Sequence, residues 1–200
     1  MKNSLCTLLL VAMSLSLATA QTEKGRWTVG AQVGNLSYSS RADSKTTTIL
    51  LSPSAGYFVA KNVVIGASVP LFYSYSKSTP PVQSSFNPYE LTSTLIGLSP
   101  YVRVYFGDSK LRPFVNASVG YNKQWNSIKL GTQANKADDG YVSYGISAGA
   151  AYFINNNISL DAALAYSGGD QLNISDFFNN GLTQSKSIGL SVGFRLFLGR

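Results

Sequence analysis

Residues 144–166 read YGISAGAAYFINNNISLDAALAY and contain two copies of one pattern, joined by three asparagines. On each side of Asn155, Asn156 and Asn157, apolar side chains alternate with glycine, serine, alanine or a charged group. A period of two residues places successive side chains on opposite faces of a β-strand. This stretch therefore predicts an antiparallel hairpin with one apolar face and one face of small or polar groups.

The same alternation recurs about eight times along the chain, and one face of each repeat is almost uniformly apolar. A soluble sandwich buries its apolar faces, whereas apolar faces that all point outward need hydrocarbon around them. We therefore predict an all-β protein, an eight-stranded antiparallel up-and-down transmembrane β-barrel. The predicted strands lie near residues 26–38, 47–59, 63–74, 94–106, 114–121, 144–153, 158–166 and 187–197.

The predicted connections alternate in length. Short connections fall at residues 60–62, 107–112 and 155–157, and long polar ones at 39–46, 75–92, 123–140 and 167–186. Bacterial outer-membrane barrels have short periplasmic turns, longer external loops and an even number of strands. We therefore expect the long connections outside the cell and both termini in the periplasm.

The first 20 residues have the features of a secretory signal peptide. Lys2 supplies a positive charge, residues 8–13 form a short apolar run, and Ala18 and Ala20 form a small-x-small cleavage site. We expect cleavage near Gln21, which leaves residues 21–200 as one barrel domain. Cys6 is removed with the signal peptide, so the mature chain has no thiol.

The composition excludes several kinds of active site. The chain contains no histidine, so neither a Ser-His-Asp nor a Cys-His site can form, and zinc cannot be held by imidazole. We therefore expect no enzymatic activity, no cofactor and no metal. The net charge is +7, but no basic stripe that contains aromatic groups occurs. The basic residues that we assign to the strand ends on one side are Lys24, Arg26, Lys61, Lys110, Arg112 and Arg200. We expect no nucleic-acid partner.

A few charged residues fall on the small, inward face of the predicted strands. Asp161 and Arg195 lie on neighbouring strands at similar depth, so we expect them to form an ion pair, with Arg103 approaching across the lumen and Arg26 nearby. Inward aromatic residues occupy the same half of the barrel. Glycine and serine line the other half, so we expect a lumen that is closed at the periplasmic end and forms a cup that opens outward.

Aromatic residues gather near both ends of the predicted strands. We expect them to form two girdles at the headgroup level. The residues are Trp27, Tyr57, Phe106 and Tyr152 on the short-turn side, and Tyr73, Tyr121, Tyr144 and Tyr166 on the loop side. A further four, in the predicted loops, are candidates to contact an external partner or lipopolysaccharide: Phe86, Tyr89, Phe177 and Phe178.

Two local features interrupt the pattern. The apolar phase of the first strand breaks at Leu36, which predicts a β-bulge near Asn35. Pro53 and Pro100 fall inside predicted strands, where a closed barrel has no free edge that tolerates a missing N–H. We expect a bulge or a compensating polar side chain at each proline.

Residues 54–66 (SAGYFVAKNVVIG), residues 99–106 (SPYVRVYF) and the following LRPFV of 111–115 resemble the outer-membrane protein β-barrel domain family. The resemblance covers residues 24–200. It implies the fold and an outer-membrane location rather than a particular activity. The last strand, with Gly189 and Phe194 or Phe197 in phase, resembles a barrel-assembly signal, which implies the assembly machinery as a partner during insertion.

We expect a monomer, surrounded by outer-membrane lipid, with a structural or surface-interaction role through its external loops. Two alternatives stay open. One is a narrow, low-conductance channel for ions or small solutes. The other is a soluble barrel that binds a lipophile in its lumen, which would require an apolar interior.

Overall fold

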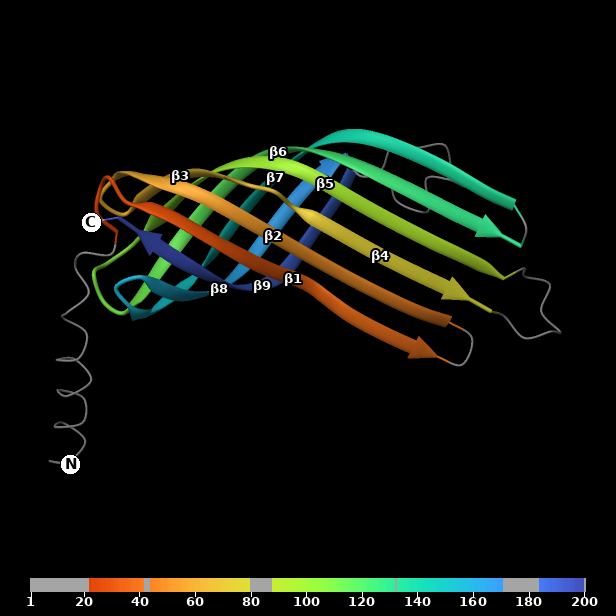
Figure 1. The fold of residues 1–200 in the computed structure, drawn as a ribbon, viewed down its shortest axis with the longest axis horizontal. Helices are drawn as coiled ribbons and strands as arrows, with labels where there is room; N and C mark the ends of the chain where they lie inside the picture. The colour runs from red at the N-terminus through yellow and green to blue at the C-terminus, as the bar shows by residue number, and fades with distance from the viewer. Residues whose placement is uncertain (1–21, 42–43, 80–87, 132, 171–183, 200) are drawn as a thin grey trace, which may run out of the picture.

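A computed structural model describes residues 22–41, 44–79, 88–131, 133–170 and 184–199 (Figure 1). The predicted signal peptide, residues 1–20, lies outside the described residues. No helix in the described part of the chain is long and apolar enough to span a membrane. The strands are β1 Trp27–Arg41, β2 Ser44–Ala60, β3 Val63–Ser68, β4 Leu71–Ser78, β5 Tyr89–Tyr105, β6 Leu111–Leu130, β7 Gln133–Asn155, β8 Ile158–Asp170 and β9 Gln184–Leu198.

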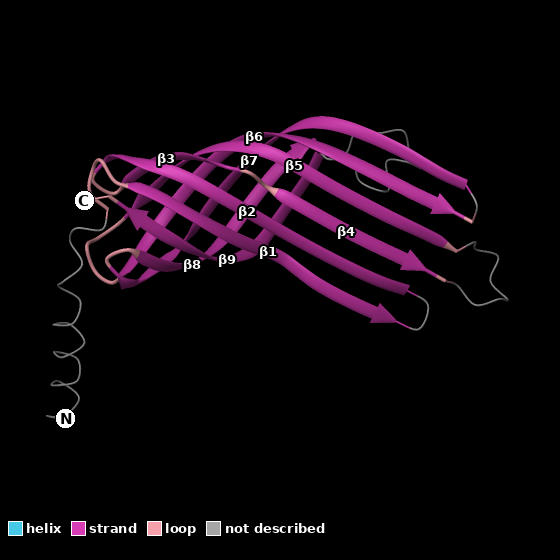
Figure 2. Ribbon diagram, viewed as in Figure 1, coloured by secondary structure: helices cyan, strands magenta, loops and turns pink. Residues whose placement is uncertain are grey.

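The strands form one closed antiparallel sheet. β1 pairs with β2 on one side and with β9 on the other, which closes the barrel. β2 pairs with β3 as far as Ser54–Ser68 and with β4 from Leu51–Leu71 in the same register. β3 and β4 are therefore two parts of one barrel strand. The prediction of an eight-stranded up-and-down barrel is confirmed, and Figure 2 shows the strands winding around a common axis.

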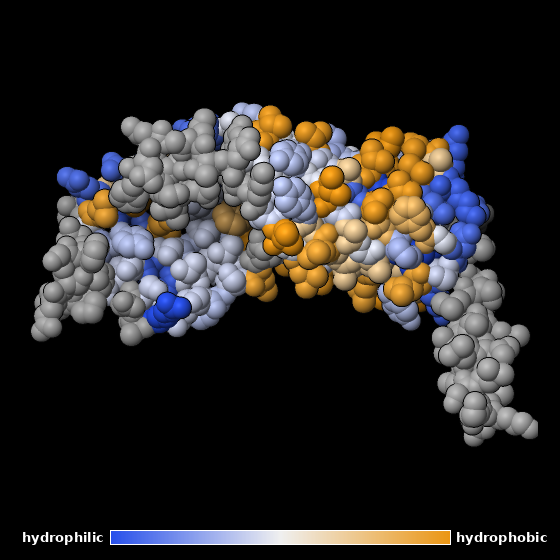
Figure 3. Space-filling view, turned by 180° about the vertical axis from the view of Figure 1, so that it is seen from behind, coloured by the Kyte–Doolittle hydropathy of each residue, from blue (hydrophilic) through white to orange (hydrophobic). Residues whose placement is uncertain are grey.

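The exposure of the side chains follows the predicted alternation. Ile146 and Leu164 are exposed, whereas Phe153 and Ala163 on the same two strands are buried. Figure 3 shows that apolar residues cover the half of the barrel nearer the short turns, and that hydrophilic residues cover the long strands beyond it. We call these two parts the short-turn end and the extended end.

Two of the four predicted long loops are mostly strand instead, and parts of the loops predicted at 75–92 and 167–186 lie outside the described residues. β6 and β7 pair without interruption from Leu111–Tyr152 to Leu130–Gln133, so the loop predicted at 123–140 is wrong. The loop predicted at 39–46 is also mostly strand, because Arg41 pairs with Ser44. Above a membrane both faces of a strand meet water, so both faces are polar and no apolar alternation marks the strand. These continuations form a polar wall at the extended end (Figure 1).

The first strand contains the predicted bulge. The β1–β2 register shifts between Gly34 and Ser37. Pairing between β1 and β9 ends at Gly34–Ser191, although β1 continues to Arg41 and β9 begins at Gln184. In that region β9 stays paired with β8. Within the described residues, β1 and β9 therefore separate at the extended end, and we call this separation the seam.

The prolines are accommodated by local interruptions of the ladder. Pro53 lies opposite the break between β3 and β4, where its carbonyl accepts a hydrogen bond of 2.9 Å from Val69 N. β5 and β6 skip Pro100 between Leu98–Tyr121 and Tyr101–Ser118 with no change of register. Neither proline causes a register shift, so the bulge alternative was wrong, because a missing N–H removes one rung of the ladder without requiring an extra residue. Next to Pro100, Ser68 Oγ donates to the carbonyl oxygen of Ser99 at 3.3 Å, a polar side chain of the kind given as the other alternative.

Candidate functional site

The lumen near the short-turn end is filled by aromatic rings. Each ring occupies an inward position close to the end of its strand, and each is at most 2% exposed. Phe153 and Phe197 have ring centroids 5.0 Å apart, and Phe58 lies 6.0 Å from Phe197. The interior of a barrel of this size is only wide enough for side chains, so such a layer closes it. The five rings of this aromatic layer are Phe58, Tyr105, Phe114, Phe153 and Phe197.

Two arginines and one aspartate lie together in the lumen, next to the aromatic layer. Arg103 Nη1 donates to Asp161 Oδ2 at 2.6 Å, and Arg195 Nε donates to the same oxygen at 3.4 Å. Ser159 Oγ donates to Asp161 Oδ1 at 2.8 Å. All three charged side chains are buried. The structure thus brings together three of the four residues expected to form the ion-pair group, which we call the Arg–Asp cluster.

The fourth residue, Arg26, lies elsewhere, so its assignment to this group was wrong. Its guanidinium donates to the carbonyl oxygen of Phe197 at 3.0 Å and to that of Asn156 at 3.3 Å. Arg26 precedes β1 at the rim of the barrel, one residue before Trp27 pairs with Leu198. It therefore ties the start of the first strand to the last strand and to the β7–β8 turn.

Arg112, one of the basic residues predicted to lie at the strand ends, is buried. Its side chain is fully buried, its guanidinium carbon lies 4.7 Å from the ring centroid of Phe153, and its Nε donates to Ser109 O at 3.0 Å. It also donates to the hydroxyl of Thr22, which is itself buried. The signal was present in the sequence, because Arg112 has the same parity as the inward Phe114.

Tyr101 links β5 to the Arg–Asp cluster from across the lumen. Its hydroxyl accepts a hydrogen bond of 3.3 Å from Arg195 Nη1. The ring lies against Gly66 and Gly56, where an added Cβ would come within 2.7 Å of Tyr101 Cζ and of its hydroxyl oxygen, respectively. Only glycine leaves room for the ring at these two positions, so the glycines set the position of the tyrosine.

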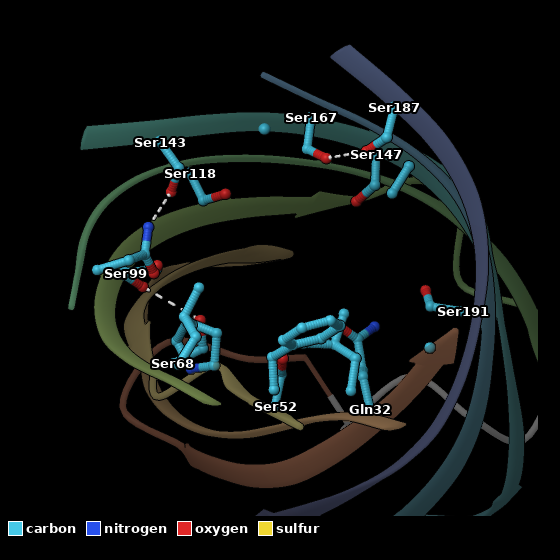
Figure 4. Close-up of a pocket in the computed structure, with 18 of the residues that line it drawn as sticks. Gln32, Ser52, Ser68, Ser99, Ser118, Ser143, Ser147, Ser167, Ser187 and Ser191 are labelled. Carbon is cyan, nitrogen blue, oxygen red and sulfur yellow. Dashed lines mark hydrogen bonds between the residues drawn. The ribbon is translucent and has the colours of Figure 1, made fainter. Parts of the chain in front are cut away.

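Beyond the Arg–Asp cluster the lumen opens into a cavity of about 1070 Å³, which we call the cup (Figure 4). Its floor includes Tyr101, Arg103 and Arg195, and no acidic residue is among its described lining residues. Asn122 donates to Ser143 Oγ at 2.7 Å, and the hydroxyls of Ser167 and Ser187 lie 2.8 Å apart. The residues labelled in Figure 4 that line the cup are Gln32, Ser52, Ser68, Ser99, Ser118, Ser143, Ser147, Ser167, Ser187 and Ser191.

The chain matches the model of the outer membrane protein beta-barrel domain family over residues 5–195. It belongs to that family. Small barrels of this family generally have no enzymatic activity, and the chain is an outer-membrane barrel of the same kind. The alternative of a soluble lipophile-binding barrel is therefore wrong.

Solved structures of small outer-membrane proteins share the fold. A major outer membrane protein from Thermus thermophilus is 13% identical with a TM-score of 0.56, and covers 88% of this chain and 100% of its own. Ail of Yersinia pestis is 11% identical with a TM-score of 0.53, and covers 88% of this chain and 99% of its own. No curated protein matches the chain. At these identities the likeness shows the architecture alone.

The eight aromatic residues expected to form girdles of this outer-membrane barrel are all exposed on its outer face. Trp27 contacts Tyr57 edge to face, with ring centroids 5.2 Å apart. On β7, Tyr152 and Tyr144 lie on the same face and eight residues apart in the sequence, about 27 Å along a strand. With the usual strand tilt of about 35–45° this spacing corresponds to about 19–22 Å along the barrel axis, slightly less than an apolar band about 25 Å tall. Contact of these rings with lipid headgroups stays a prediction.

Of the four loop aromatics, Phe86, Phe177 and Phe178 lie outside the described residues. Tyr89 is the first residue of β5, where it is exposed and pairs with Ser78 and with Leu130. It therefore belongs to the polar wall rather than to a loop.

Ion pairs connect the strands of the polar wall. Lys77 Nζ lies 2.9 Å from Glu90 Oε1 on the paired strands β4 and β5. The hydrogen bond from Lys77 lowers the pKa of Glu90 below its ordinary value, and the same bond raises the pKa of Lys77. Asp138 pairs with Lys123. No group of three or more metal-ligating side chains occurs among the described residues.

Proposed function

We propose that this outer-membrane barrel does not conduct solutes and that it binds a partner at the cell surface through its cup and polar wall. In this proposal the chain acts as a monomer. Its short-turn end and both termini face the periplasm, and its extended end faces outward among lipopolysaccharide molecules. The barrel-assembly machinery inserts it after cleavage of the signal peptide.

The closed lumen carries this proposal. A solute that crosses the barrel has to pass both the Arg–Asp cluster and the aromatic layer. Phe58 and Phe197 are 0% exposed, and Arg112 fills the space beneath Phe153. A water-filled path would leave side chains of this layer partly exposed. The narrow channel that the sequence left open is therefore the weaker explanation.

The contrast between the two ends supports the proposed orientation. The connections at residues 61–62 and 156–157 are tight, whereas the opposite ends of the strands rise into the polar wall. In bacterial barrels the short turns face the periplasm and the longer segments face outward.

Conductance across planar bilayers tests the closed lumen. The informative variant is Phe153→Ala/Phe197→Ala, which removes two touching rings from the layer. The matched control is Phe194→Ala, which removes an exposed ring from the lipid face of the same strand as Phe197. We expect steady conductance only from the double variant. A wild-type conductance equal to that of the double variant would contradict the proposal.

Epitope labelling of intact cells tests the orientation. One epitope is inserted at Gly131 in the β6–β7 turn, and the other at Gly107 in the β5–β6 turn. Both glycines have a positive φ and open space around the position of a Cβ, so both turns tolerate insertion. We expect antibodies to label the Gly131 insertion on intact cells and the Gly107 insertion only after the outer membrane is permeabilised. The reverse pattern would overturn the orientation.

A further inference from the structure

The Arg–Asp cluster contains two guanidinium groups and one carboxylate. Both guanidiniums approach the same atom, Asp161 Oδ2, and the other carboxylate oxygen accepts from Ser159. At neutral pH the cluster therefore carries one surplus positive charge. Arg103 and Arg195 are each 2% exposed. A buried charge without a counter-charge is unfavourable, so this arrangement favours the binding of an anion.

The surplus charge lies at the floor of the cup. Arg103 and Arg195 both line the cavity, whose described lining residues include no aspartate or glutamate. Within the described part of the chain, Arg103 Nε has no hydrogen-bond acceptor. The guanidinium carbon of Arg103 lies 4.2 Å from the ring centroid of Phe114, which offers no anion. A buried donor and a positive charge therefore remain at the floor of a cavity that is open at its other end.

We propose that the floor of the cup binds the anionic group of a hydroxylated ligand, either a carboxylate or a phosphate. Arginine binds both groups well, because its planar donors match their oxygens. Asn116 pairs with Arg103 in the β5–β6 register and also lines the cavity. Above the floor, the serine hydroxyls that line the cup provide both donors and acceptors, which suits the hydroxyl groups of a sugar.

This inference rests on the proposed function, because it takes the cup as the surface that meets the partner. A sugar acid in the medium and a phosphorylated sugar of lipopolysaccharide both carry the required chemistry. A basic floor in a narrow cavity also concentrates anions before they bind. A neutral sugar has the hydroxyl groups but lacks the charge, so it provides the matched comparison.

The experiment measures binding to the full mature chain, refolded in zwitterionic detergent, by isothermal titration calorimetry. The probes are inorganic phosphate, glucuronate and glucose at constant ionic strength. Three variants are compared with the wild type: Arg103→Gln, Asp161→Asn and Lys123→Gln. The last removes an exposed positive charge from the wall, so it tests for a general effect of net charge.

We expect phosphate and glucuronate to bind the wild type and Lys123→Gln alike, and glucose to bind at least tenfold more weakly. Arg103→Gln makes the cluster neutral and should weaken anion binding by about tenfold or more, whereas Asp161→Asn raises the surplus charge and should strengthen it by a similar factor. A purely structural cluster would give losses in both variants. If Asp161→Asn does not fold without anions, phosphate should restore folding, and Arg103→Gln should show no such dependence.

Equal anion binding by the wild type and Arg103→Gln, or weaker binding by Asp161→Asn, would overturn the inference. A competition experiment distinguishes the two sources of the ligand. If glucuronate displaces lipopolysaccharide from the wild type, the ligand is lipid-borne. If glucuronate does not displace lipopolysaccharide, the ligand is a free sugar acid. Conductance of the same preparations reports on the closed lumen separately. A failed anion site therefore leaves the proposed function testable on its own.

Discussion

Replacing Asp161 with alanine should destabilise the barrel strongly, because it leaves two arginines facing each other inside the lumen. The carboxylate lies 2.6 Å from Arg103 Nη1 and 3.4 Å from Arg195 Nε, and the Asp161 side chain is 1% exposed. Removal of one partner from a buried ion pair typically costs about 3–5 kcal/mol. Since two arginines lose the same partner here, we expect a loss in the upper part of this range.

The assay is equilibrium unfolding by urea in phospholipid vesicles, in a buffer that contains no inorganic phosphate. Unfolding is followed by the fluorescence of Trp27 and Trp125. Asp138→Ala is the matched control, because Asp138 pairs with Lys123 on the exposed wall. We expect no measurable loss from the control. The double variant Asp161→Ala/Arg103→Met should recover part of the stability, because it also removes one of the uncompensated charges.

Equal midpoints for Asp161→Ala and Asp138→Ala would refute the reasoning. That result would mean that water reaches the cluster and solvates both arginines. The double variant Asp161→Ala/Arg103→Met tests whether the loss of stability comes from a cavity instead. If it came only from a cavity, the additional change at Arg103 would increase the loss. Recovery in the double variant therefore points to charge rather than to packing.

Three further predictions follow from the lipid face, the lumen and the wall. Leu164 lies midway between the levels of Tyr152 and Tyr144, so Leu164→Arg should lower the free energy of unfolding in vesicles by about 2–4 kcal/mol. Leu160 pairs with Tyr152 at the girdle, so Leu160→Arg should lower it by only about 0–1 kcal/mol. Equal costs would contradict the assigned depths. Gly66→Ala should cost roughly 1–3 kcal/mol, because the added Cβ would come within 2.3 Å of the carbonyl oxygen of Ala55 on the paired strand and within 2.7 Å of Tyr101 Cζ. Gly34→Ala, where the nearest neighbour lies at 3.6 Å, should be tolerated in the same unfolding assay. Carbon-detected NMR should place the pKa of Glu90 below its ordinary value, and Lys77→Met should raise that pKa. Because the pKa of Glu90 is lowered in the folded state, the stabilisation from this ion pair is present above the ordinary pKa of a glutamate. It is lost as the pH falls through the lowered pKa of Glu90.

The strands of the membrane half could be predicted because hydrocarbon selects apolar residues on one face only. That alternation also fixes which side chains point inward, and so it places Arg103, Asp161 and Arg195 on the inner face. The same parity applies to Arg112, but we predicted only that it lies at a strand end and not that it is buried. Burial is tolerated there because the guanidinium lies over Phe153 and donates to Ser109 and Thr22.

The extended end could not be predicted in the same way. Residues 123–140 are mostly polar on both faces, and a strand surrounded by water needs only its ladder and cross-strand pairs. The contacts of Arg26 depend on how the rim closes between β1 and β9, which no local pattern records. The seam begins at Gly34, next to the register shift between Gly34 and Ser37. The sequence predicts the bulge there but not the separation of β1 from β9.

The seam has a consequence for how such a protein diversifies. The first and last strands have to pair to close the barrel. Among the described residues, this pairing extends from Trp27–Leu198 to Gly34–Ser191. That joint spans the lipid-covered half, so its length is set by membrane thickness and not by how far the hairpins project. Hairpins above it can grow, shrink or be exchanged between relatives without altering circular closure. The exterior of the molecule can therefore change under selection while the cylinder beneath it stays the same.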